Sequence, residues 1–116
     1  MNTLQLILSL FVLTISSTIM AQTHQKKNLN ELHQNMDAVH THMMFPATGG
    51  KVISLSIPQN TQLKEHTTPI PALLVCIEGE VVFEDEKGNS VTLKPGDYVN
   101  IEPDIKHWVN GIKNSQ

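Results

Sequence analysis

The sequence predicts an all-β domain of about eight short antiparallel strands, arranged as a sandwich or a barrel. Three observations carry this prediction. Short β-compatible apolar segments recur after residue 38, and turn residues separate them roughly every 6–12 positions. No segment in this region shows the 3.6-residue period of a long amphipathic helix. The single cysteine, Cys76, excludes an internal disulfide, so the hydrophobic core must stabilise the domain.

The first 21 of the 116 residues have the composition of a secretory signal peptide. They contain no Asp, Glu, Lys or Arg, and residues 4–13 form an apolar run. Ala21 fits a cleavage position. The amino-terminal end lacks Lys and Arg, which leaves an uncleaved membrane anchor as the alternative, although the run is shorter than the ~20 residues of a membrane span. We therefore expect an exported protein, periplasmic or extracellular, with residues 1–21 as its signal peptide.

The remaining composition limits the classes of partner. The net charge is −3, and all cationic side chains apart from histidine are lysines. A weakly acidic surface without arginine argues against nucleic acid and against anionic membranes, and we expect no stable membrane span after cleavage. Residues 22–38 are polar, with Leu29, Leu32 and Met36 either on one face of a short helix or in a disordered segment. Residues 39–116 form the predicted β-domain.

Four strands are predicted in the first half of the domain. Residues 39–45 have β-compatible composition and partial alternation, and a Thr-Gly-Gly turn follows. Residues 51–57 alternate apolar side chains with serines. Residues 63–68 are a short extended piece, because the two prolines that follow exclude a helix and the centre of a sheet. Residues 72–77 are a continuous apolar run, which predicts a strand buried on both faces.

Four further strands are predicted in the second half. Residues 81–84 and 90–93 flank a polar Gly-Asn turn, the pattern of a hairpin. Residues 84–86 at its tip are acidic and are predicted to be solvated. A Pro-Gly-Asp turn precedes the strand of residues 98–101, and a proline opens the loop before the last strand, residues 107–109. Strand lengths and spacings of this kind are typical of antiparallel barrels.

Two blocks of the sequence carry a family resemblance. His66 precedes the turn segment of residues 77–81, and Pro95-Gly96-Asp97 is followed by His107 at a matching spacing. These blocks resemble the two motifs of the cupin superfamily, in the form of a small single-domain (type-2-like) cupin with a degenerate metal motif. The resemblance covers residues 51–109 and implies a cupin-like jelly-roll β-barrel with a pocket between its sheets.

The resemblance also implies four metal-ligand positions, of which two keep a ligand. His66 and His107 stand where the motifs place histidines. Thr68 and Ala72 stand where the first motif places a second histidine and a glutamate, and we expect these two residues to line the pocket. Two imidazoles alone bind a metal loosely. His66 and His107 are therefore the candidate ligands for one divalent metal ion, which would need a third ligand from elsewhere, and no catalytic residue is identified.

Two loop positions depart from the family pattern. Asn60 and Asp104 stand where the resemblance expects glycine. Asn60 is a mild change, because asparagine tolerates the left-handed backbone region that glycine would supply.

Other reactive side chains have two interpretations. His40 and His42 form a His-x-His pair that either binds metal or belongs, with His33 and His24, to an exposed histidine-rich edge. Cys76 lies in the most apolar segment, which favours a buried structural thiol over a catalytic one.

The carboxy-terminal end of the chain bears on whether the barrel is closed. Cupins of this kind typically add one more strand after the second motif, where this chain has residues 111–116. We expect an open sheet edge, which either a second copy covers in a homodimer or the strand near Val39 fills.

The sequence therefore predicts an exported module that binds a small molecule in the barrel pocket, with at most one divalent metal ion and without catalysis. A metal-dependent cupin enzyme, an oxygenase or isomerase of a small molecule, is one alternative. A structural or dimerisation module is the other, because fold alone does not fix function.

Overall fold

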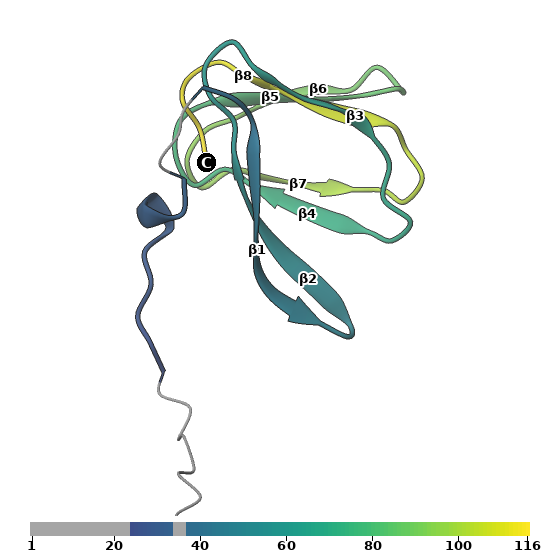
Figure 1. The fold of residues 1–116 in the computed structure, drawn as a ribbon. Coiled ribbons are helices and arrows are strands. Elements are labelled where there is room, and N and C mark those ends of the chain that lie inside the picture. Colours follow the sequence, from purple (N-terminus) through teal and green to yellow (C-terminus); the bar gives the residue numbers. More distant parts are fainter. Residues whose placement is uncertain (1–23, 34–36) are drawn as a thin grey trace, which may run out of the picture.

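The computed structural model describes residues 24–33 and 37–116. The predicted signal peptide and Met36 lie outside the described residues. Within the described ranges, the predicted amino-terminal helix is limited to one 3-10 turn, η2, and no helix has the length and hydropathy needed to cross a membrane. The elements, shown in Figure 1, are η2 (Leu29–Glu31), β1 (His40–Ala47), β2 (Gly50–Ser56), β3 (Gln62–His66), β4 (Ala72–Val75), β5 (Val81–Asp85), β6 (Ser90–Leu93), β7 (Tyr98–Ile101) and β8 (His107–Gly111).

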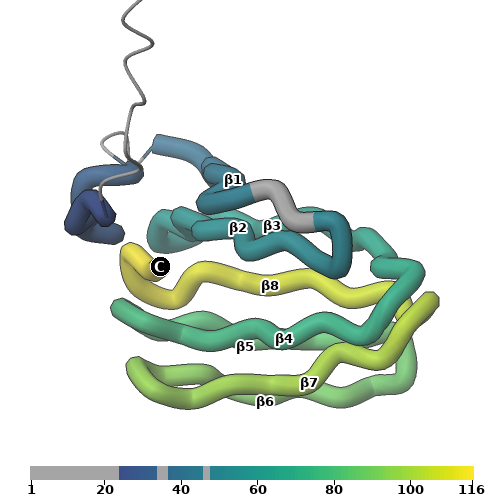
Figure 2. Tube along the Cα trace, turned by 90° about the horizontal axis from the view of Figure 1, so that it is seen from below, coloured from purple at the N-terminus to yellow at the C-terminus, as the bar shows by residue number. Residues whose placement is uncertain are grey.

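The strands lie in two layers that enclose the core (Figures 1 and 2). One layer is a four-stranded antiparallel sheet in the order β3-β8-β5-β6. The other layer consists of two separate antiparallel pairs, β1-β2 and β4-β7. Each predicted strand is present, because the short alternating segments and the turns between them specify hairpins rather than helices. The predicted all-β fold of about eight short antiparallel strands is confirmed.

The core is built by alternate side chains that point between the layers. On β5, Val81 and Phe83 are buried, whereas the residues between and after them are half-buried. On β8, His107 and Val109 are buried with the same period of two. The core cluster consists of Ile57, Cys76, Val81, Phe83, Leu93, Ile101 and Val109.

The prediction that residues 72–77 are buried on both faces is wrong. Ala72 and Leu74 pack against the core, but Leu73 is 61% exposed and Val75 is also exposed. The reason is that no described element covers the outer side of the β4-β7 pair. An apolar run predicts a strand, but it does not show whether another element covers the outer face of that strand.

The serines of β2 are buried although they lie on the outer face. Leu55 of β2 packs against the core, so Ser54 and Ser56 point away from it, yet they are only 7% and 1% exposed. The His33 imidazole Nε2 lies 2.9 Å from the Ser54 hydroxyl, and the Gln116 side-chain amide donates to the same hydroxyl and to the first carbonyl of η2. The amino-terminal segment and Gln116 therefore cover this face of β2.

The two substituted loop positions have the backbone that glycine would supply. Asn60 has φ 62° and Asp104 has φ 61°, both in the left-handed region. The Asn60 backbone N–H donates to Gly111 at the end of β8, and the Asp104 N–H donates to the Thr68 carbonyl. Asn60 therefore has the left-handed backbone that asparagine was expected to tolerate, and Asp104 has a similar φ.

Among the described strands, β2 and β4 are not hydrogen-bonded to each other, and we call this unpaired boundary the slot. Figure 2 shows β1 and β2 on one side of it, β4 and β7 on the other, and the carboxy-terminal end of the chain near one end of these strands. Ser115 exchanges two backbone hydrogen bonds with Ile57, just after β2, and Gln116 is bonded to Ile77 and Glu78, just after β4. The carboxy-terminal segment thus enters one end of the slot. β1 pairs with the other edge of β2, so the strand near Val39 does not fill the slot.

Among the glycines with a positive φ, Gly79 is the one at which an added methyl group has the least room. We expect Gly79→Ala to lower the free energy of unfolding by at least about 2 kcal/mol, because its φ of 84° is left-handed and the new Cβ would collide with the Asn114 carbonyl and with Ser115. Gly88→Ala is the matched control, because its φ is 87° but its surroundings are open. Urea denaturation measures both variants. Equal losses in the two variants would show that the close approach at Gly79 is unimportant.

Candidate functional site

The structure brings the two motif histidines together. His66 ends β3 and His107 begins β8, and these residues are partners in the antiparallel register of the two strands. Their ring centroids lie 4.2 Å apart, with the planes at 62° in an edge-to-face arrangement. The predicted convergence of these two side chains is therefore observed.

Each of the two rings is oriented by the backbone carbonyl two residues before it. Nδ1 of His66 lies 2.8 Å from the Lys64 carbonyl oxygen, and Nδ1 of His107 lies 2.9 Å from that of Ile105. A carbonyl oxygen only accepts hydrogen bonds, so Nδ1 carries the proton in both rings. In the neutral rings Nε2 is then the nitrogen with a free lone pair, available to accept a hydrogen bond or to bind a metal.

The two histidines differ in burial. His107 is 2% exposed and stacks on Phe83, with ring centroids 5.7 Å apart and planes at 28°. His66 is exposed. The pair therefore spans from the core to the rim of the barrel, and His107 has the role of a core side chain as well as that of a candidate ligand.

The other two motif positions supply no metal ligand. The Thr68 hydroxyl donates to the Ile70 carbonyl at 3.0 Å. Ala72 lies on the inner side of β4, paired with Ile101, and offers only a methyl group. Among the described residues, no three His, Cys, Asp or Glu side chains are grouped so that they could hold a metal ion. The arrangement therefore contains two candidate ligands and not the three that protein metal sites of this kind need.

The amino-terminal histidines form a separate group. His40 and His42 pair with Ser56 and Ser54 in the β1-β2 register. His33 contacts the same strand through Ser54. Burial lowers the pKa of His33 because desolvation disfavours its charged form, and the neighbouring His42 and His40 lower it further by repulsion between like charges. Of these three histidines, His33 joins the amino-terminal segment to β2 by a side-chain hydrogen bond, whereas His40 and His42 are exposed on β1.

Cys76 is a buried thiol, as predicted. It is 3% exposed, and its Sγ lies 3.5 Å from the Glu78 carbonyl oxygen. Burial raises the pKa of the Cys76 thiol, and the nearby Asp97 and Glu80 carboxylates raise it further. A raised pKa and a closed environment both suppress nucleophilic reactivity.

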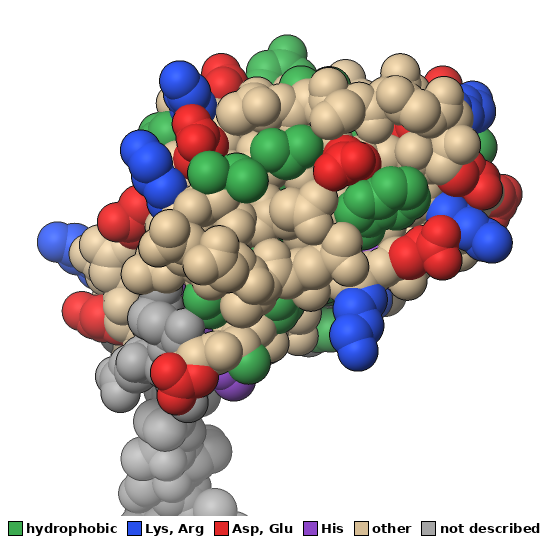
Figure 3. Space-filling view, turned by 90° about the horizontal axis from the view of Figure 1, so that it is seen from above, with side chains coloured by type: hydrophobic (Ala, Val, Ile, Leu, Met, Phe, Trp, Pro, Cys, Tyr) green, Lys and Arg blue, Asp and Glu red, His purple; other side chains and the backbone are tan. Residues whose placement is uncertain are grey.

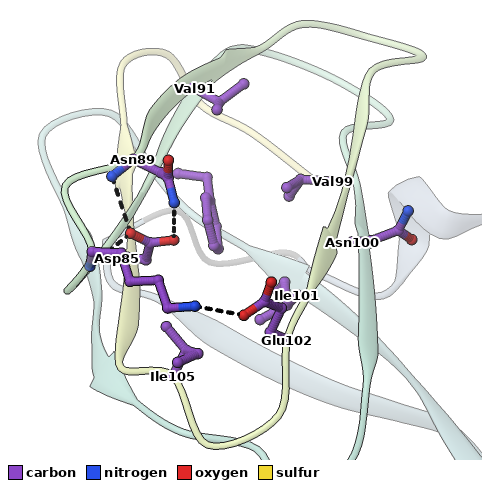
Figure 4. A pocket seen from close by; sticks show the side chains of 10 residues that line it. Asp85, Asn89, Val91, Val99, Asn100, Ile101, Glu102 and Ile105 are labelled. Carbon is purple, nitrogen blue, oxygen red and sulfur yellow. Dashed lines mark hydrogen bonds and ion pairs between the residues drawn. The ribbon is translucent and has the colours of Figure 1, made fainter.

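A cavity of about 170 Å³ opens between the β5-β6 hairpin and β7. Figure 4 shows Val91 and Val99 pointing into it from opposite layers, whereas Asn100 points away. Its wall is apolar and its rim is polar. The apolar lining residues are Phe83, Val91, Val99, Ile101 and Ile105, and the polar ones are Asp85, Lys87, Asn89, Asn100 and Glu102.

Two residues that line the cavity also contact His107. Phe83 lines the cavity and stacks on His107, and Ile105 lines it and accepts the hydrogen bond from His107. Neither the expected pocket residues, Thr68 and Ala72, nor the candidate ligands, His66 and His107, line this cavity. The signal that could have located it is the alternation of the strands, which places Phe83 and Asp85 on one face of β5.

The rim of the cavity is organised by the hairpin turn. The Asp85 carboxylate accepts from the backbone N–H groups of Lys87 and Asn89 and from the Asn89 side-chain amide, as Figure 4 shows in part. The Asn89 side chain foremost, and then these N–H groups, lower the pKa of Asp85. Asp85 therefore stabilises the hairpin turn.

An ion pair crosses the mouth of the cavity between the two layers. Lys87 Nζ lies 2.8 Å from a Glu102 carboxylate oxygen. The hydrogen bond to Glu102 and its charge raise the pKa of Lys87. Because both side chains are more than half exposed, the pair adds little to stability. The ion pair does, however, neutralise the charges of Lys87 and Glu102 at the mouth of the cavity.

Comparison with known proteins shows which family this chain belongs to. A model of the cupin domain family matches residues 54–115, more than half of the chain. This chain belongs to the cupin domain family. The match begins in β2 and continues through β8, so it contains both the histidine pair and the cavity of this cupin.

Solved structures show the same fold at low sequence identity. A cupin superfamily protein from Desulfitobacterium hafniense superposes with a TM-score of 0.71 at 14% identity, covering 82% of this chain and 86% of that one. An RmlC-like cupin protein from Desulfovibrio desulfuricans gives 0.67 at 17%, covering 79% and 91%. A cupin-like protein from Thermotoga maritima gives 0.59 at 21%, covering 66% and 62%. No curated protein matches this cupin.

The different burial of the two histidines predicts different effects on stability. We expect His107→Ala to lower the free energy of unfolding by about 2–4 kcal/mol, because it removes a buried ring that stacks on Phe83 and a buried hydrogen bond. We expect His66→Ala, at an exposed position, to cost less than about 1 kcal/mol. Denaturation at a fixed pH measures both. A larger loss for His66→Ala would contradict the assignment of His107 to the core.

Proposed function

We propose that this cupin is an exported binding module whose cavity beside His107 takes a small neutral ligand, without catalysis and without a resident metal ion. The observation that carries the proposal is the cavity itself, because it combines an apolar wall with a polar rim. Ligand sites in proteins usually combine these two features, the wall providing affinity and the few polar groups orientation.

The volume of the cavity limits the size of the ligand. At about 170 Å³ it is below the range of sites for drug-sized molecules. An apolar cavity of about 150 Å³ holds one benzene molecule, so a ligand of about six to ten non-hydrogen atoms fits here. At the binding energies per atom that small ligands reach, the expected Kd lies between about 1 µM and 1 mM.

The charges at the mouth favour a neutral ligand. Lys87 is paired with Glu102, and Asp85 adds a second carboxylate to the rim. An anion would meet net negative charge there, and a cation would have to compete with Lys87 for Glu102. A ring-sized compound with a hydroxyl or amide group would place its ring against Phe83 and Val99 and its polar group toward Asn89.

The metal that the family resemblance implies does not fit the residues present. His66 and His107 offer two Nε2 atoms, but Thr68 donates its hydroxyl elsewhere and Ala72 has no ligand atom. A stable site of this type takes three or four protein ligands. The proposal therefore assigns His107 to the support of the cavity wall and not to a metal centre.

Export is supported by the amino-terminal composition and by the thiol. Residues 1–21 have the uncharged, apolar character of a signal peptide. Cys76 is the single cysteine and is buried, so the described residues offer no exposed thiol that could form an intermolecular disulfide in an oxidising compartment. Fractionation of expressing cells would test this, because a retained anchor would place the protein in the membrane fraction instead of the soluble exported fraction.

Ligand binding is tested by blocking the cavity. Benzamide and benzyl alcohol should shift the NMR signals of Val91, Val99 and Ile105 in a saturable way, and benzoate should bind at least about tenfold more weakly because of the acidic rim. Val91→Trp should abolish these shifts by filling the cavity. Thr92→Trp is the matched control, because Thr92 is the next residue of β6 and points to the opposite side.

Two results would contradict the proposal. One is saturable binding that survives Val91→Trp, since the ligand would then lie elsewhere. The other is the absence of any shift with all three compounds at millimolar concentration, since the cavity would then be a packing defect.

A further inference from the structure

A short amino-terminal segment of this cupin is joined to the barrel by hydrogen bonds rather than by apolar packing. Residues 24–33, which we call the strap, contain η2 and lie beside the carboxy-terminal end of the chain (Figures 1 and 2). No residue of the strap is buried. The strap therefore has the few buried contacts that are typical of elements that open before the rest of a fold.

The hydrogen bonds of the strap converge on the Ser54 hydroxyl of β2. The His33 imidazole Nε2 lies 2.9 Å from this hydroxyl, and the Gln116 side-chain amide donates to it at 3.2 Å. The same amide donates to the Leu29 carbonyl of the strap at 2.9 Å. Ser54 is only 7% exposed, but its hydroxyl can bond to water once the strap leaves. Opening this interface therefore hydrates a polar group rather than side chains of the core.

Two further imidazoles lie on the same side of the β1-β2 pair. His42 and His40 of β1 are the register partners of Ser54 and Ser56, and register partners carry their side chains on the same side of a sheet. Figure 3 shows the opposite side of the molecule, where Lys and Asp or Glu side chains are interspersed and histidine is visible mainly at the lower edge. The strap therefore ends in a histidine cluster, formed by His33, His40 and His42, rather than among mixed charges.

The charged groups that act on His33 are the other two imidazoles of the histidine cluster. Burial lowers the pKa of His33, and repulsion from His42 and His40 lowers it further. Glu31 and Asp37 are the carboxylates nearest to His33 along the chain, and both are exposed. Neither is among the groups that change the pKa of His33. A positive charge on His33 is therefore opposed by its described surroundings.

The other two elements packed against the strap present neutral groups to it. β2 contributes the Ser54 hydroxyl, whereas its Lys51 lies three positions away and so points to the other face of the sheet. The carboxy-terminal segment contributes the Gln116 amide, and the main-chain oxygen of Gln116 accepts from the N–H groups of Ile77 and Glu78. The histidine cluster therefore sets the charge at this interface.

We infer that acid releases the strap, which binds β2 while the histidine cluster is neutral and detaches when the cluster becomes charged. Histidine gains its charge as the pH falls from about 8 to about 5. The bound strap holds fewer protons than the free strap, because binding lowers the pKa of His33 from its ordinary value of 6.5. Attachment is therefore strongest above about pH 6.5 and weakens as the pH falls below it.

This inference is independent of the proposed ligand. None of the residues that line the cavity belongs to β1, β2 or the strap. Release of the strap frees the Gln116 side chain and exposes the outer face of β2, and it leaves the cavity walls in place.

NMR relaxation of the strap amides tests the inference on protein purified after expression of the full chain. Between about pH 7.5 and about pH 5.0, the order parameters of Leu29, Asn30 and Leu32 should fall from about 0.85 to below about 0.6. His33→Gln replaces the imidazole with a neutral side chain that can still bond to Ser54. This variant should keep the strap ordered at about pH 5.0.

Two further variants separate charge from structure. His24→Gln is the matched control, because His24 is an exposed histidine of the strap that does not act on His33. This variant should lose its order at acidic pH as the wild-type protein does. The double variant His40→Gln/His42→Gln should raise the pKa of His33, followed through its ring signals, because it removes the repulsion from the two imidazoles.

Three results would overturn the inference. The first is a wild-type strap with the same order at both pH values. The second is an equal loss of order in His33→Gln, since release would then not depend on this side chain. The third is the simultaneous loss of the β5 and β8 signals, since acid would then unfold the domain instead of detaching the strap.

Discussion

The backbone hydrogen bonds that β8 makes on both of its edges are the constraint on which the rest of the structure depends. β8 pairs with β3 on one side and with β5 on the other, in antiparallel register. A strand held on both edges cannot slip without losing bonds on each, and a slip of one residue would turn His107 outward and Trp108 inward. The register therefore puts His107 in the core and Phe83 beside it.

The cavity between β5, β6 and β7 depends on the same register. Phe83 reaches the cavity from β5, and Ile105 reaches it from the loop that leads into β8, while its carbonyl fixes the His107 ring. His107, at a position that the family resemblance assigns to a metal ligand, stacks on Phe83 of the cavity wall. Thr68 and Ala72 supply no further ligand beside it. The second layer lacks this double pairing. It is divided by the slot, and its apolar residues remain exposed.

Much of the fold could be predicted from the sequence, because alternation and turn residues act locally. The convergence of His66 and His107 was also predictable, since motif spacing places them at the adjoining ends of two strands. What covers a strand could not be predicted. The burial of Ser54 depends on His33 and Gln116, which are far away in the sequence. The cavity was missed for the same reason, because a polar turn shows nothing of the β7 strand that faces it.

Calorimetric titration of zinc into metal-stripped protein tests the central claim most directly. The double variant Thr68→His/Ala72→Glu, which restores the family's ligand set, is the positive control. The account predicts no binding to the wild-type chain at micromolar zinc, and one ion per chain, with a stabilisation of about 2.7 kcal/mol at a hundredfold excess over Kd, in the double variant. One tightly bound ion per wild-type chain, lost in His66→Ala and in His107→Ala, would contradict the account.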